Sequence, residues 1–151
     1  MSIEARLKEL NITLPDAPAP AANYVPFVQS GNLVFVSGQI SANENGLITG
    51  KLGADLDVAA GQAAARRCGL ALIAQLQAAI GDLDRVVRVV KLGGFVNSTA
   101  DFTDQPKVVN GCSDLMVEVF GDAGRHARAA VSAPSLPLGV AVEVDAVFEV
   151  K

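Results

Sequence analysis

Two oppositely charged residues stand out in the last part of the chain, because each interrupts an apolar run. Arg128 lies in the run Ala127–Ala133, and Glu143 follows fifteen positions later in the run Val142–Val150. The small neighbours of Arg128 give its side chain little cover from water. Such a guanidinium usually holds an anion through two parallel hydrogen bonds. The anion is a carboxylate of the protein or of a ligand, so Arg128 either pairs structurally with Glu143 or binds substrate.

Missing motifs narrow the chemistry that these residues could do. The single histidine, His126, has no cysteine or carboxylate at metal-ligand spacing, and no G-x-S-x-G, P-loop or G-x-G-x-x-G motif occurs. We therefore expect no metal and no organic cofactor. An arginine, a glutamate, one tyrosine and several glycines are a weak set for cleaving a stable bond. They suffice for a reactive imine or enamine of a 2-oxo acid, to which water adds with little help.

The elements that must position these residues follow from hydrophobic periodicity and capping signals. A single domain over 1–151 is expected, and it begins with a short helix and a Pro/Ala linker that together cover 1–23. Two helices are expected, one from Asp55 or Asp57 to Ile80 and one from Thr103 or Asp104 to Phe120. The expected strands are Tyr24–Gln29, Leu33–Ile40, a short one within Leu47–Leu52, Val86–Val96, Ala127–Ala133 and Val142–Val150. This order predicts an α+β fold, a mixed sheet with two helices on one face.

Side-chain alternation predicts which residues face the core. In the last strand Val142, Val144 and Phe148 share one face, whereas Glu143 and Asp145 share the other. The β-branched run Val86–Val96 predicts a strand buried on both faces. The second helix has a core stripe of Val109, Cys112, Met116 and Val119, and both cysteines, Cys68 and Cys112, are expected as small buried hydrophobes.

Three segments carry a resemblance to a known family. They are "YVPFVQSGNLVFVSGQI" from Tyr24, "VVNGCSDLMVEVFG" around Asn110, and "ARAAV" followed by "LPLGVAVEVDAVF". Together they resemble the RidA/YjgF family of reactive-intermediate deaminases, which has the chorismate mutase-like fold. The chain departs from the usual pattern at Pro26 and Ala129, carries one extra residue before Arg128, and has a longer N-terminus. It therefore resembles a divergent, longer-chain subgroup, also labelled endoribonuclease L-PSP-like.

The resemblance implies a role for each matching residue. Arg128 matches the arginine for the substrate carboxylate, Glu143 the glutamate that orients the attacking water, and Tyr24 an active-site tyrosine. Residues at substrate-binding positions of the family are Ser37, Gly38, Asn110 and Ala130. In this family the site forms between subunits of a trimer. From the residues alone, Ser37-Gly38 could instead mark a strand bulge, Tyr24 could only pack, and Asn110 could be a solvated helix residue.

Composition limits the partners. Hydrophobic residues make up 50% of the chain and charged residues 19%, which favours apolar surface hidden in a homo-oligomer. The net charge of −4 argues against nucleic-acid binding, which needs a basic stripe. The apolar run "GLALIAQLQAAI" is too short and interrupted to span a bilayer, so no membrane contact and a cytoplasmic location are expected.

Three functions remain open. The first is a hydrolase resembling 2-iminobutanoate/2-iminopropanoate deaminases, which converts a small 2-imino acid to a 2-oxo acid and ammonia. The second is a non-catalytic homotrimer that binds small carboxylates in clefts between subunits. The third is an endoribonuclease or translation inhibitor, a label that the resemblance also brings.

Overall fold

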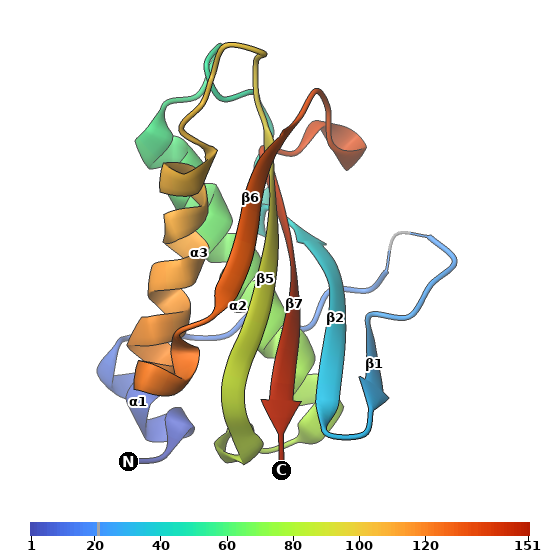
Figure 1. Ribbon diagram of the computed structural model, residues 1–151, viewed down its shortest axis with the longest axis vertical. Helices are drawn as coiled ribbons and strands as arrows, with labels where there is room; N and C mark the ends of the chain where they lie inside the picture. The colour runs from blue at the N-terminus through green and yellow to red at the C-terminus, as the bar shows by residue number, and fades with distance from the viewer. Residues whose placement is uncertain (21) are drawn as a thin grey trace.

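The structure is a computed structural model, and it describes residues 1–20 and 22–151. A twisted mixed sheet forms one layer, and two long helices cover one of its faces (Figure 1). A short N-terminal helix lies against the second long helix, and the linker that follows crosses to the opposite side of the molecule before the first strand. The predicted fold class is therefore confirmed. None of the described helices combines the length and hydropathy that a membrane crossing requires.

The helices are α1 (Ile3–Glu9), α2 (Val58–Ile80) and α3 (Gln105–Phe120). The strands of the main sheet are β1 (Phe27–Ser30), β2 (Leu33–Ile40), β5 (Val86–Asn97), β6 (Ala127–Ala133) and β7 (Val142–Val150). The strands β3 (Ala42–Asn43) and β4 (Gly46–Leu47) form a small separate hairpin. Three 3₁₀ turns are η1 (Leu83–Arg85), η2 (Gly121–Gly124) and η3 (Pro137–Gly139).

The sheet order places β6 and β1 at opposite edges. The order is β1-β2-β7-β5-β6, and every pair is antiparallel except β5 with β6. The parallel pair needs a crossover, which α3 supplies. In Figure 1 β6 and β1 therefore lie at opposite edges of the sheet. Arg128 belongs to the β6 edge, whereas Tyr24 precedes the β1 edge.

Small residues let the two long helices approach each other closely. Asp57 caps α2, its side chain accepting the Ala60 amide at 2.8 Å, and Gly81 ends it with a positive φ of 81°. A Cβ added at Gly111 of α3 would overlap the carbonyl oxygen of Gln62 of α2. Glycine is therefore required at that crossing, and the close approach holds α3 in place below β5 and β6.

The predicted strand boundaries are wrong in two places. β1 begins at Phe27 rather than Tyr24, and Pro26, which has no N–H to donate to a sheet ladder, precedes it. The expected strand over Leu47–Leu52 is absent from the described chain, because Gly50 adopts a φ of 129° that breaks an extended run. Its first residue, Leu47, instead ends the β3–β4 hairpin.

The expectation that β5 is buried on both faces is also wrong. Val89, Leu92 and Val96 are fully buried beneath the helices, but Lys91 on the other face is exposed. Only one face of the sheet is covered by helices (Figure 1). The helix-free face exposes further apolar side chains, with Phe35 at 43% and Val131 at 45% of their accessible area.

Candidate functional site

One pocket brings together three of the predicted site residues. It has a volume of about 640 Å³ and lies between the N-terminal linker, β2, β7 and the loop that contains Pro137 and Leu138. Tyr24, Gly38 and Glu143 line it, and its wall is mostly apolar, with prolines of the linker on one side. The pocket therefore places one carboxylate within an apolar cleft.

The carboxylate of Glu143 depends on a glycine opposite it. Glu143 is half-buried on the helix-free face of β7, and a Cβ added at Gly38 of β2 would overlap its Oε2. The β2–β7 register shifts between Val36 and Gln39, so the strand irregularity named as the alternative interpretation of Ser37-Gly38 is present, and Gly38 lines the pocket as well. Burial, followed by the nearby carboxylate of Asp145, raises the pKa of Glu143 above its ordinary value. A carboxylate with a raised pKa in a cleft is suited to accept and return a proton.

Ser37 does not line the pocket, but it forms hydrogen bonds to residues next to the pocket. Its Oγ donates to the carbonyl of Val25 at 2.9 Å, and its backbone N–H donates to the carbonyl of Pro26 at 2.9 Å. These bonds hold the residues just after Tyr24 against β2. The Tyr24 side chain is 46% exposed at the mouth of the pocket.

Two buried glutamines that sequence reasoning missed also contribute to the pocket. Gln75 of α2 is 1% exposed and Gln39 of β2 is 7% exposed. The Gln75 Nε2 donates to the carbonyl of Pro18 at 2.6 Å and contacts the Gln39 Oε1 at 3.4 Å. These bonds fasten the linker over the pocket. The sequence alone indicates that Gln75 is unusual, because it is a polar residue within the apolar run of α2.

Arg128 lies elsewhere, between β6 and α3. Its Nη1 donates to the Ser113 Oγ at 3.0 Å and its Nη2 to the carbonyl of Pro106 at 3.1 Å. Among the described residues these are the only hydrogen bonds of the guanidinium, so three of its five N–H groups are without a partner. Asn110 lies between these two contacts on the same helix face, four residues after Pro106 and three before Ser113.

Arg128 and Glu143 lie on opposite faces of the sheet. Arg128 pairs in register with Leu92, which is fully buried under the helices, whereas Glu143 pairs with Phe95 on the helix-free face. Arg128 forms no ion pair with any described residue. The alternative of a structural Arg128–Glu143 pair is therefore wrong.

The predicted site residues thus form two separate groups. The first group, at the β6–α3 edge, consists of Arg128, Asn110 and Ala130. Ala130 pairs in register with Gly94, which faces the helices, so Ala130 faces them as Arg128 does. The second group, at the linker and β2–β7, consists of Tyr24, Ser37, Gly38 and Glu143. Within one chain the first group can bind an anion and the second can move a proton, but no one substrate reaches both.

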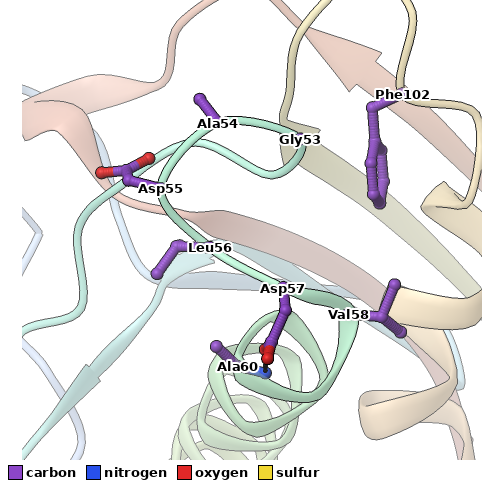
Figure 2. A pocket seen from close by; sticks show the side chains of 8 residues that line it. All are labelled: Gly53, Ala54, Asp55, Leu56, Asp57, Val58, Ala60 and Phe102. Atoms are coloured by element: carbon purple, nitrogen blue, oxygen red, sulfur yellow. Dashed lines mark hydrogen bonds between the residues drawn. The ribbon is translucent and has the colours of Figure 1, made fainter.

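A second hollow, of about 670 Å³, opens at the start of α2 (Figure 2). Its lining carries no cationic or nucleophilic side chain, and Figure 2 shows the Asp57 carboxylate turned onto the Ala60 amide as the helix cap. Asp55 is likewise engaged, accepting the Lys51 amide at 2.7 Å. Among the described residues, no cluster of histidine, cysteine, aspartate or glutamate could hold a metal. We assign this hollow no chemistry.

Both cysteines are inert in this arrangement. Cys68 and Cys112 are buried and unpaired. Burial raises the pKa of Cys112 to about 12 and that of Cys68 well above its ordinary value. A thiol that stays protonated at neutral pH is a poor nucleophile, so neither residue is a candidate for covalent catalysis.

The fold is that of a chorismate mutase-like domain, and the comparisons with known proteins agree with this. Residues 4–149 match the family described as "YjgF/chorismate_mutase-like, putative endoribonuclease". Protein TCP17 of Trypanosoma cruzi is 57% identical over an alignment of 149 residues that covers 97% of this chain and 93% of the relative.

Two solved structures are similar along nearly the whole chain. Protein Atu1372 of Agrobacterium tumefaciens, described as of unknown function, has a TM-score of 0.91 and 50% identity over 99% of this chain and 92% of its own. A protein of Shewanella oneidensis that carries the endoribonuclease description has a TM-score of 0.95 and 36% identity, over 99% of this chain and all of its own. The chain belongs to the YjgF/chorismate mutase-like family.

Proposed function

We propose that this protein is a cytoplasmic, homotrimeric hydrolase that converts small 2-imino acids to 2-oxo acids and ammonia. One observation carries the proposal. Arg128, with free N–H groups for an anion, and Glu143, a carboxylate suited to accept a proton, lie at separate places of one chain, so neither place alone has both functions. Contact between two copies would complete the site. The half-exposed Phe35 and Val131 on the helix-free face offer apolar surface for such contact.

The chemistry starts from binding. The free N–H groups of Arg128 would hold the carboxylate of a 2-imino acid through two parallel hydrogen bonds, and the Asn110 amide lies on the same helix face. The apolar pocket around Tyr24 and Leu138 of the adjoining copy would take the substrate side chain. The reacting carbon would then lie toward Glu143.

Hydrolysis needs water and one shuttled proton. A water held by the Glu143 carboxylate adds to the iminium carbon, and the carboxylate takes the proton that the water loses. Glu143 then returns this proton to the amine nitrogen of the carbinolamine. The C–N bond breaks as the carbonyl forms, and the hydroxyl proton leaves with the ammonia, so that the iminium and water become a 2-oxo acid and ammonium. The raised pKa of Glu143 suits this exchange at neutral pH.

The carboxylate-binding trimer without turnover is the second candidate. Arg128 supports this candidate as much as the enzyme, because both functions need a cation that contacts only uncharged groups of the protein and so stays available to an anion. The endoribonuclease description of some relatives has little support from the residues here. The one histidine, His126, is bonded to a backbone carbonyl and a serine rather than placed beside a second acid–base group.

Ammonia release tests the proposal directly. The protein is mixed with 2-aminoacrylate or with bulkier imino acids generated in the cuvette by an amino acid oxidase, and ammonia is followed against the spontaneous rate. We expect acceleration by the wild type and a trimer in light scattering. Pyruvate binding without acceleration would support the carboxylate-binding trimer, and a stable monomer at micromolar concentration would refute both.

A further inference from the structure

We propose that Ser113 and His126 position Arg128 for its ligand, through a chain of hydrogen bonds that contains no carboxylate. The proposal rests on the proposed function, because it assumes that Arg128 binds a carboxylate. It assigns a role to the only histidine of the sequence and to a serine that no motif indicated.

For a neutral imidazole, the carbonyl acceptor at the end of the chain fixes the direction of each hydrogen bond. The His126 Nδ1 lies 2.6 Å from the carbonyl oxygen of Gly124, which can only accept, so Nδ1 carries the ring proton. In the neutral ring Nε2 then accepts, and the Ser113 Oγ at 2.9 Å donates its proton to it. The serine oxygen keeps a lone pair for the Arg128 Nη1–H at 3.0 Å.

The far end of this chain is fixed by the fold. Gly124 is buried in η2, and a Cβ added to it would overlap the carbonyl oxygen of Met116 in α3. No side chain larger than glycine fits there, so the turn is pressed against the helix that carries Ser113. The imidazole is therefore held between a fixed carbonyl and a fixed hydroxyl.

The arrangement holds the guanidinium without neutralising it. Both groups that Arg128 contacts, the Ser113 hydroxyl and the Pro106 carbonyl, are uncharged, and no described carboxylate pairs with it. A protein carboxylate in their place would compete with the ligand. The bonds instead fix the plane of the guanidinium, and a ligand that needs two parallel bonds depends on that plane.

The first test measures ligand binding in the full-length protein. Pyruvate is titrated calorimetrically into the wild type and into Ser113→Ala, His126→Ala, Arg128→Ala and Thr13→Ala. The last is a matched control, because Thr13 is exposed and its hydroxyl makes no hydrogen bond with a described residue. Each variant removes a hydrogen bond that fixes the guanidinium plane, and the loss of one such bond corresponds to about tenfold weaker binding in the first two variants. Thr13→Ala should bind as the wild type does.

Two further measurements separate positioning from general stability. The double variant Ser113→Ala/His126→Ala should bind no more weakly than Ser113→Ala, because the histidine acts through the serine. Ser113→Thr keeps a hydroxyl and His126→Gln keeps an acceptor, so both should recover most of the affinity. With an imino acid substrate, Ser113→Ala should raise KM and leave kcat within about twofold, since water attack depends on Glu143.

The outcomes are distinguishable. If Arg128→Ala loses pyruvate while Ser113→Ala and His126→Ala bind it normally, the positioning proposal is overturned and the proposed function stands. If the two losses add in the double variant, His126 does not act through Ser113. If the wild type binds pyruvate no better than Arg128→Ala, the proposed function fails and the positioning role fails with it. If the alanine variants unfold, Ser113→Thr and His126→Gln decide between the outcomes. Normal pyruvate binding by folded forms of both supports the positioning role, and about tenfold weaker binding refutes it.

Discussion

Replacement of Arg128 by alanine should abolish carboxylate binding and leave the fold intact. Within the chain the side chain makes two hydrogen bonds, to the Ser113 Oγ and to the Pro106 carbonyl, and both partners lie at the β6–α3 edge where water can replace it. A net loss of about 1–3 kcal/mol of folding stability is expected from two such bonds. That loss is small enough for a domain of this size to stay folded.

The loss in binding should be larger. A desolvated charge pair with two parallel hydrogen bonds contributes about 2–5 kcal/mol when one partner is removed. With about 1.4 kcal/mol for each tenfold change, the dissociation constant for pyruvate should rise about 30-fold to about 4,000-fold. Arg128→Lys keeps the charge but not the planar fork, so it should recover only part of this loss.

Calorimetric titration with pyruvate, together with thermal unfolding of the same samples, measures both effects. A folded Arg128→Ala protein that binds pyruvate with wild-type affinity would falsify the assignment of Arg128 as the anion site. Unfolding of Arg128→Ala with retention of the fold in Arg128→Lys would instead mean that its two bonds to α3 are structural.

Further predictions concern the pocket on the other side of the sheet. Glu143→Gln should lower kcat more than it raises KM, because a group that positions water and moves a proton acts chiefly in the transition state; equal losses in binding and rate would contradict this. Because burial and Asp145 raise the pKa of Glu143 in the folded chain, the folded state binds that proton more tightly than the unfolded state. This contribution to wild-type stability is therefore present at low pH and is lost as the pH rises through the raised pKa. In urea unfolding, the free energy of unfolding of Glu143→Gln should exceed that of the wild type at pH 7 but not at pH 4. A constant difference between the two proteins would exclude this linkage. Gly38→Ala should displace the Glu143 carboxylate, because its Cβ would overlap Oε2, and should lower kcat about tenfold while pyruvate binding by Arg128 changes little; unchanged kcat in steady-state assays would show that the carboxylate position is not critical.

Local patterns predicted most of the elements. β2, β6 and β7 have the predicted bounds, and α2 follows Asp57, one of its two predicted caps, and ends at Ile80 as predicted. The predictions failed at the first strand, at the expected strand over 47–52, and in the burial of β5. The first two errors come from local signals that the apolar pattern outweighed, Pro26 before β1 and the positive φ of Gly50, whereas the burial of β5 depends on a sheet face that no helix covers.

The sequence by itself determined which residues could do chemistry. Family resemblance and apolar context selected Arg128 and Glu143, and period two placed Glu143 on the face opposite Val142 and Val144, which the structure confirms. Only the tertiary structure decided where these two residues lie relative to each other. β5 is inserted between β6 and β7, and the register of each pair turns Arg128 toward the helices and Glu143 away from them. Strand order and register arise from contacts between distant segments, so no local pattern encodes them. The same reason hid Ser113 and His126, which meet Arg128 only because α3 crosses from β5 to β6 and lies alongside it.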